Sequence, residues 1–176
     1  MSDANWEAKF EEIFNAGVQA HRRGAHDAAA MFGTREEAFL GTIGCTSQEL
    51  FDFVDDHCRR GEPDFAAARA VTAIRRRYFL EVQHGIPSQF QIDPLELPAK
   101  HEELDGFRWL PRIIAKARAK LRGELDPSIM YCCGGDLEFL DSIGMSAPDF
   151  LQLVWDAGNL DSRILAAVKA AVVNAR

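Results

Sequence analysis

An internal repeat limits the fold of this 176-residue chain more than any other feature of its sequence. Residues 38–54, AFLGTIGCTSQELFDFV, align without a gap to residues 138–154, EFLDSIGMSAPDFLQLV, at an offset of 100 residues. Shorter matches continue in the same order upstream and downstream. The identical positions in the aligned stretch are Phe39/Phe139, Leu40/Leu140, Ile43/Ile143, Gly44/Gly144 and Val54/Val154. An ordered series of this kind predicts two diverged copies of one unit.

Each copy has the periodicity of helices. In the second copy, apolar residues recur at helical spacing and end at a glycine, in the order Leu110, Ile114, Ala117, Leu121 and Gly123. Residues suited to capping precede the other apolar segments and predict helix starts at Thr46, Asp64, Ser146 and Asp161. No segment shows a convincing strand alternation. The sequence therefore predicts an all-α fold.

Proline marks the connection between the copies. We expect a first repeat over residues 1–84, a connecting strap over 85–104 and a second repeat over 105–176. The three prolines of the strap exclude a continuous helix, and its apolar residues are too many for a solvated linker. We expect it to be extended and to lie along both copies. Because each copy is small, we also expect the two to pack about a pseudo-two-fold axis, as in a fused homodimer.

The charge balance restricts the partners. With 20 basic and 27 acidic residues the net charge is −7, which disfavours binding to the phosphate backbone of nucleic acids. No apolar run is long enough for a membrane span, and the acidic start lacks the apolar core of a signal peptide. We therefore expect a cytoplasmic protein without a nucleic-acid or membrane partner.

The cysteines and histidines are not spaced as a metal site. In a reducing cytoplasm the four cysteines are expected to be free thiols, and none belongs to a CxxC pair. No phosphate-binding glycine loop or dinucleotide-binding motif is present. The sequence predicts neither a metal site nor a bound cofactor.

Basic residues form a stripe in the second copy only. Arg112, Lys116 and Lys120 are spaced i, i+4 and i+8, so on a helix they share one face. The aligned positions of the first copy are Ile13, Gly17 and His21. A binding site retained in one copy would explain this asymmetry, with Arg112 and Lys116 holding an anion. The alternative is an exposed helix face whose cations are simply solvated.

The segment MYCCGGD, residues 130–136, is a second candidate region. Gly134 and Gly135 stand before a helix predicted to start after Asp136, where backbone N–H groups can face an anion, and Tyr131 is adjacent. Asp136 is a candidate acid–base group alongside Lys116. The alternative is a plain turn in which Asp136 is an N-cap.

Two cysteines and a tryptophan complete the candidate set. Cys132 and Cys133 precede a helix start, where a thiol can become nucleophilic, and copy one has no thiol there. Trp109 precedes the cationic helix and is a candidate wall of a pocket. Packing in a core is the alternative for all three side chains.

One pattern of residues extends through the second copy: Gly106, Leu110, Pro111, Arg112, Lys116, Arg118, Ala119, Asp136, Phe139 and Leu140. With this pattern, about 70 residues of the second copy resemble a bacterial family of small helical domains of unknown function. The family typically has an acidic residue before the lysine, where this chain has Ala115. The resemblance implies a fold unit and a set of candidate residues, but no activity.

Two hypotheses for function follow. In the first, the protein binds a small acidic molecule, or is a cofactor-independent enzyme acting on one, in a pocket built mainly by the second repeat. In the second, it is a non-catalytic helical adaptor or oligomerisation protein whose apolar strap contacts a partner. The one-sided retention of charge favours the first.

Overall fold

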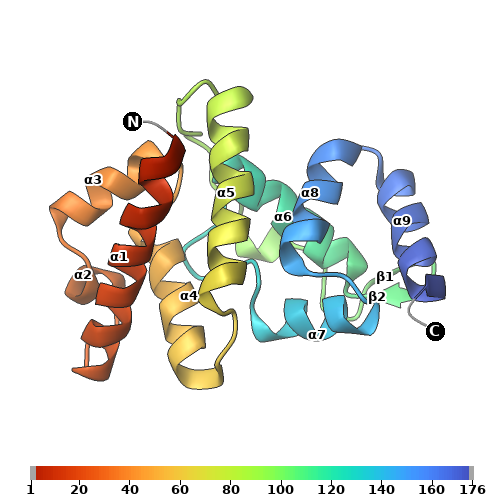
Figure 1. Ribbon diagram of the computed structural model, residues 1–176. Coiled ribbons are helices and arrows are strands. Elements are labelled where there is room, and N and C mark those ends of the chain that lie inside the picture. Colours follow the sequence, from red (N-terminus) through yellow and green to blue (C-terminus); the bar gives the residue numbers. More distant parts are fainter. Residues whose placement is uncertain (1–2, 175–176) are drawn as a thin grey trace. The chain divides into compact units, whose positions relative to one another are not determined.

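The computed structural model describes residues 3–174, whose regular secondary structure is helical apart from one two-stranded hairpin (Figure 1). The predicted all-α fold is therefore confirmed. The chain forms two compact units, Met1–Pro87 and Ser88–Arg176, called the first and the second unit below. Within residues 3–174, no helix is long and apolar enough to cross a membrane.

Over its described residues, 3–87, the first unit consists of five helices. They are α1 (Asp3–Arg22), α2 (Ala28–Met31), α3 (Thr34–Thr42), α4 (Ser47–Arg60) and α5 (Phe65–Glu81). Helix α1 lies along α4 and α5 (Figure 1). Its buried face carries Phe10 and Phe14, and α4 buries Leu50 and Phe53. This apolar stripe at helical spacing forms the core of the first unit.

Between residues 88 and 174, the second unit contains four α-helices and the hairpin. Its elements are the 3-10 helix η1 (Pro94–Glu96), the strands β1 (Glu103–Leu104) and β2 (Phe107–Arg108), and the helices α6 (Leu110–Arg122), α7 (Gly134–Ser142), α8 (Ala147–Ala157) and α9 (Asp161–Asn174). Helix α8 packs against α6, α7 and α9. Leu110 and Ile114 of α6 and Phe150 and Val154 of α8 are buried, as their spacing predicts.

Capping residues set several helix ends as the sequence predicts. Thr46 and Glu49 form a reciprocal capping box at α4, and Asp64 caps α5 by accepting a bond from Ala67 N–H. At α8, Ser146 accepts from the Asp149 N–H. Gly123 ends α6 in the left-handed conformation, with φ of 67°, which a residue with a Cβ adopts only under strain.

Helices α3 and α7 correspond closely in length, position and termination. Both span nine residues, beginning at Thr34 and Gly134. Each is followed by a left-handed glycine, with φ of 69° at Gly44 and 67° at Gly144. The Cys45 N–H donates to the Leu40 carbonyl, and the Met145 N–H donates to the Leu140 carbonyl, both at 3.0 Å. The two segments therefore share one local backbone plan.

The strap is not extended throughout. No α-helix spans residues 85–104, as the prolines predict, but this stretch contains η1 and β1. From Ser88 onward it belongs to the second unit, where Ile92 N–H donates to the Glu124 carbonyl at 2.9 Å and Ser88 Oγ to Glu124 Oε1 at 2.9 Å. Polar contacts of the strap backbone and side chains therefore fix this segment to the end of α6.

Candidate functional site

A tight hairpin positions Trp109 at the start of α6. Strands β1 and β2 pair antiparallel, with Leu104 opposite Phe107, around the turn residues Asp105 and Gly106. Both turn residues have positive φ, 53° and 84°, as a two-residue hairpin turn of the Asp-Gly type requires. Trp109 follows β2 in the left-handed conformation, with φ of 73°. This is a strained conformation for a bulky residue, so the surrounding contacts must hold it.

The basic residues of α6 do not form an exposed stripe. Lys116 and Lys120 are 3% and 2% exposed, whereas Arg112 is half-buried. The periodicity places their Cα atoms on one face correctly. It does not reveal that this face packs inside the second unit, so the alternative of simply solvated cations is wrong for both lysines.

A buried carboxylate explains why Lys116 is tolerated inside. Lys116 Nζ donates to Asp136 Oδ2 at 2.5 Å, and the Asp136 side chain is fully buried. The same oxygen accepts from the Cys132 backbone N–H at 3.0 Å, and Oδ1 accepts from Trp109 Nε1–H at 2.9 Å. Three donors therefore surround this carboxylate, which offsets much of the cost of removing two charges from water.

The two adjacent cysteines have different environments. Cys133 is the N-cap of α7 and half-buried, and its Sγ accepts a hydrogen bond from Lys116 Nζ at 3.2 Å. Cys132 is fully buried in a left-handed conformation, with φ of 75°. Burial, followed by the charge of Asp136, raises the pKa of the Cys132 thiol far above its ordinary value, which keeps it protonated at neutral pH. Cys132 is therefore no nucleophile in this state.

Gly135 admits the indole of Trp109 against α7. A Cβ added at Gly135 would lie 2.7 Å from Trp109 Cζ2 and 2.8 Å from Cη2, distances that a methyl group does not tolerate. The helix begins at Gly134, so the two glycines form its first turn, and the predicted start after Asp136 was too late. Close packing of the indole on this turn brings Trp109 Nε1 to Asp136.

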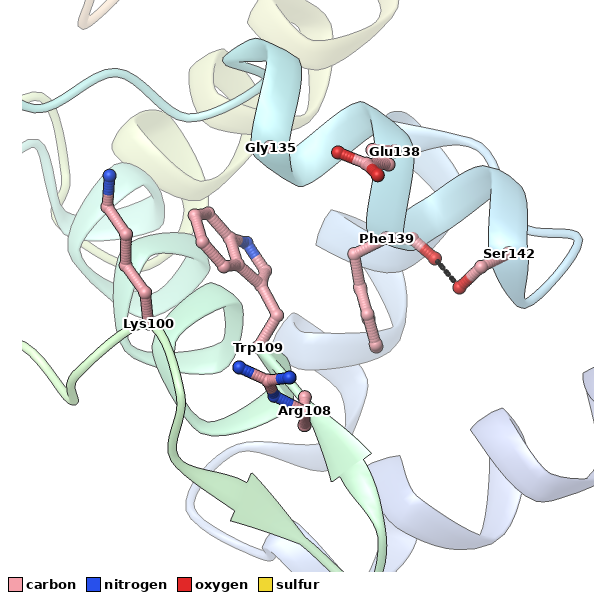
Figure 2. A pocket seen from close by; sticks show the side chains of 7 residues that line it. All are labelled: Lys100, Arg108, Trp109, Gly135, Glu138, Phe139 and Ser142. Carbon is pink, nitrogen blue, oxygen red and sulfur yellow. Dashed lines mark hydrogen bonds between the residues drawn. The ribbon is translucent and has the colours of Figure 1, made fainter.

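A pocket of about 440 Å³ lies beside this cluster in the second unit (Figure 2). Its lining residues are Lys100, Arg108, Trp109, Gly135, Glu138, Phe139 and Ser142. Figure 2 shows the rings of Trp109 and Phe139 as its apolar walls, with Arg108 below the indole and Glu138 on α7. Lys100 Nζ lies 6.0 Å from the centroid of the Trp109 ring, within cation–π range.

The predicted site residues fall into three locations. Only Trp109 and Gly135 line the pocket, while Lys116, Asp136 and Cys133 form the buried cluster behind them. Arg112 donates to the Pro98 carbonyl at 2.7 Å, with its guanidinium carbon 6.0 Å from the Trp109 ring centroid. Arg112, Lys116 and Asp136 therefore do not converge in an open cleft.

The remaining predicted residues serve local structure. Tyr131 is buried, and its hydroxyl donates to the Ala147 carbonyl at 2.8 Å, which ties the loop before α7 to the start of α8. Burial raises the pKa of Tyr131 well above its ordinary value. Gly134 is the first residue of α7 and is not among the pocket-lining residues.

Sequence reasoning did not select five residues of the pocket: Lys100, Arg108, Glu138, Phe139 and Ser142. Glu138 could have been selected by the argument used for Lys116, which is a charge present in one copy only. It aligns with the uncharged Ala38 of the first copy. Phe139 is identical in both copies, so the comparison of the copies does not single it out. Lys100 lies in the strap and has no aligned counterpart, and Arg108 aligns with Lys9, which is also basic, at the offset that pairs Arg112 with Ile13.

No metal site accompanies this pocket. In the part of the chain that the structure describes, no three His, Cys, Asp or Glu side chains are grouped to hold a metal ion. None of the four cysteines forms a disulfide within the described residues.

Comparison with known proteins gives one finding. Residues 96–175 match a family model described as a domain of unknown function (DUF5069). The match covers just under half of the chain and includes every pocket-lining residue and the whole buried cluster. No curated protein and no solved structure matches the chain. The similarity therefore concerns the second unit and carries no activity.

Proposed function

We propose that the second unit binds a small acidic molecule with a flat apolar part in the pocket beside Trp109. The observation that carries the proposal is the presence of two cations on a pocket of about 440 Å³. Neither Lys100 nor Arg108 forms an ion pair with a side chain among residues 3–174. The volume lies within the range typical of small-molecule sites.

The lining residues supply complementary interactions. The Arg108 guanidinium offers a planar fork that suits a carboxylate, and Lys100 adds a second positive charge. The Trp109 and Phe139 rings supply apolar surface for the remainder of the ligand. Arg108 and Lys100 replace Arg112 and Lys116 as the anion-binding residues in this proposal.

The buried cluster acts on the pocket through Trp109. Asp136 accepts from the indole N–H and is itself held by Lys116 and the Cys132 backbone. Lys116 and Asp136 are therefore positioning residues, which hold the indole in place despite its strained backbone. An enzyme that used the Cys133 thiol would need a substrate atom beside that thiol. Cys133 contacts Lys116 but is not among the pocket-lining residues.

Titration with matched anionic and neutral aromatics tests the proposal. The Trp109 Nε1–H resonance, assigned by its loss in Trp109→Phe, is followed while benzoate or 3-phenylpropionate is added, and the corresponding amides serve as uncharged probes. We expect saturable shifts with the acids and weaker binding of the amides. Arg108→Gln should weaken acid binding by about tenfold, since a charge-assisted bond is lost.

Arg163→Gln is the matched control, because it removes the same charge from an exposed residue of α9. Acid binding should be unchanged in this variant. A Trp109 resonance that does not respond to either acid, or equal weakening by the two arginine variants, would contradict the proposal.

A second candidate function rests on exposed apolar residues of the strap. Leu95 is 92% exposed and Phe90 59%, in a region that otherwise packs on the second unit. Such residues suit a partner surface of an adaptor or oligomerisation protein. Light scattering tests this candidate: a mass that rises with concentration and falls again in Leu95→Ser supports it, and a constant monomer mass contradicts it.

We infer that the two units arose by duplication of one ancestral helical unit. The equal lengths of α3 and α7 at the offset of 100, their glycine termination and the similar caps of α4 and α8 support this inference. A pseudo-two-fold relation between the repeats, a bacterial origin and a cytoplasmic location remain predictions. An experimental structure in which α3–α4 fails to superpose on α7–α8 would contradict the duplication.

A further inference from the structure

The pocket contains an unpaired negative charge as well as its two cations. Glu138 lies on α7 and lines the same pocket as Arg108 and Lys100. No ion pair joins Glu138 to either cation among the residues that the structure describes, so their charged atoms are more than 4.0 Å apart. Charges of both signs therefore face one pocket without neutralising each other.

The opposite charges are separated along the apolar walls. In Figure 2, Arg108 lies below the Trp109 indole on the β2 side, and the Glu138 carboxylate lies above Phe139 on the α7 side. A ligand whose flat group contacts the two rings can thus extend one polar end toward each charge. A single anion satisfies the Arg108 end only and leaves Glu138 facing a like charge.

From this arrangement we infer that the ligand is a small zwitterion of the amino-acid type. Its carboxylate binds Arg108 and Lys100, its ammonium group binds Glu138, and its apolar part packs between Trp109 and Phe139. This inference rests on the proposed function and specifies the chemical class of the ligand. Glu138 is the residue that distinguishes a zwitterion from a plain acid, because an acid gains nothing from a carboxylate in the pocket.

Three probes of one shape test the inference: L-phenylalanine, 3-phenylpropionate, which lacks the ammonium group, and 2-phenylethylamine, which lacks the carboxylate. Each is titrated while the Trp109 Nε1–H resonance is followed. We expect phenylalanine to bind about tenfold more tightly than either of the other probes. In Glu138→Gln, phenylalanine should bind only as tightly as 3-phenylpropionate does.

Asp141→Asn is the matched control, because Asp141 is an exposed carboxylate of the same helix that does not line the pocket. The preference for phenylalanine should persist in this variant.

If 3-phenylpropionate binds the native protein as well as phenylalanine does, the inference is overturned and the proposed function stands. If none of the probes shifts the Trp109 resonance, both are overturned. If Asp141→Asn abolishes the preference as Glu138→Gln does, the assignment to Glu138 is wrong.

Discussion

The two units place a glycine against an aromatic ring in opposite ways. In the first unit Gly17 lies on the long helix α1, and a Cβ there would be 3.2 Å from the ring of Phe32, which belongs to the loop before α3. In the second unit Gly135 lies on the short helix α7 and receives Trp109, which precedes the long helix α6. The ring comes from a different element in each unit.

The surroundings of Gly17 and of its aligned residue Lys116 also differ in polarity. Gly17 aligns with Lys116, so the position that accommodates Phe32 in the first unit holds an ammonium group in the second. In the first unit, Phe32 and its neighbour Met31 lie against Gly17. In the second unit, Lys116 contacts Asp136 and Cys133. At this aligned pair of positions, the first unit therefore has an apolar contact and the second unit a polar cluster.

The largest effect is expected from Lys116→Met, which keeps an apolar stem but removes the ammonium group. Asp136 would then be a buried carboxylate without its cation, and the free energy of unfolding of the second unit should fall by about 3–5 kcal/mol. Hydrogen exchange measured peptide by peptide separates the two units. Exchange should accelerate in α6 and α7 and stay unchanged in α1 and α4.

The double variant Lys116→Met/Asp136→Asn is the control for charge. It removes both charges, while the amide oxygen introduced in place of the carboxylate can still accept from Trp109 Nε1–H. The double variant should therefore be more stable than Lys116→Met alone. A double variant less stable than the single one would show that the ion pair is not the reason for the loss.

The sequence predicts the helices well because they depend on local signals. The apolar spacing of Leu110, Ile114 and Leu121 and the capping residues Thr46 and Asp64 act within a few residues of themselves. Burial of Lys116 depends instead on Asp136, which is 20 residues away and approaches only in the folded unit. The charged residues of the pocket were not predicted, because Arg108 reaches it from the hairpin and Lys100 from the segment just before the hairpin, and hairpin geometry is not encoded in helical periodicity.

Gly135→Ala tests the tight contact of the second unit. The new methyl group would collide with the Trp109 ring, which must move and lose its bond to Asp136, so the free energy of unfolding should fall by about 1–3 kcal/mol. Gly41→Ala is the matched control on α3, because no atom lies within 4 Å of the added Cβ. It should raise stability by up to about 1 kcal/mol through helix propensity.

The double variant Gly135→Ala/Trp109→Phe checks the cause of that loss. A smaller ring relieves the collision, so the double variant should be no less stable than Trp109→Phe alone. Equal effects of Gly135→Ala and Gly41→Ala on urea unfolding would contradict a special role for the glycine at the Trp109 contact.

The second unit should lose stability at alkaline pH, an effect that is absent at neutral pH. Burial raises the pKa values of Cys132 and Tyr131 in the second unit above their ordinary values of 9.0 and 10.0. The unfolded chain therefore releases these protons first, so the stabilisation is complete below about pH 9 and is lost as the pH rises. Each proton contributes a slope of up to about 1.4 kcal/mol per pH unit.

Urea unfolding of Trp6→Phe at pH 8 to 11 should show this decline, because the remaining tryptophans, Trp109 and Trp155, report on the second unit. Tyr131→Phe should flatten it above about pH 10, whereas an unchanged slope in that variant would exclude Tyr131 as a source.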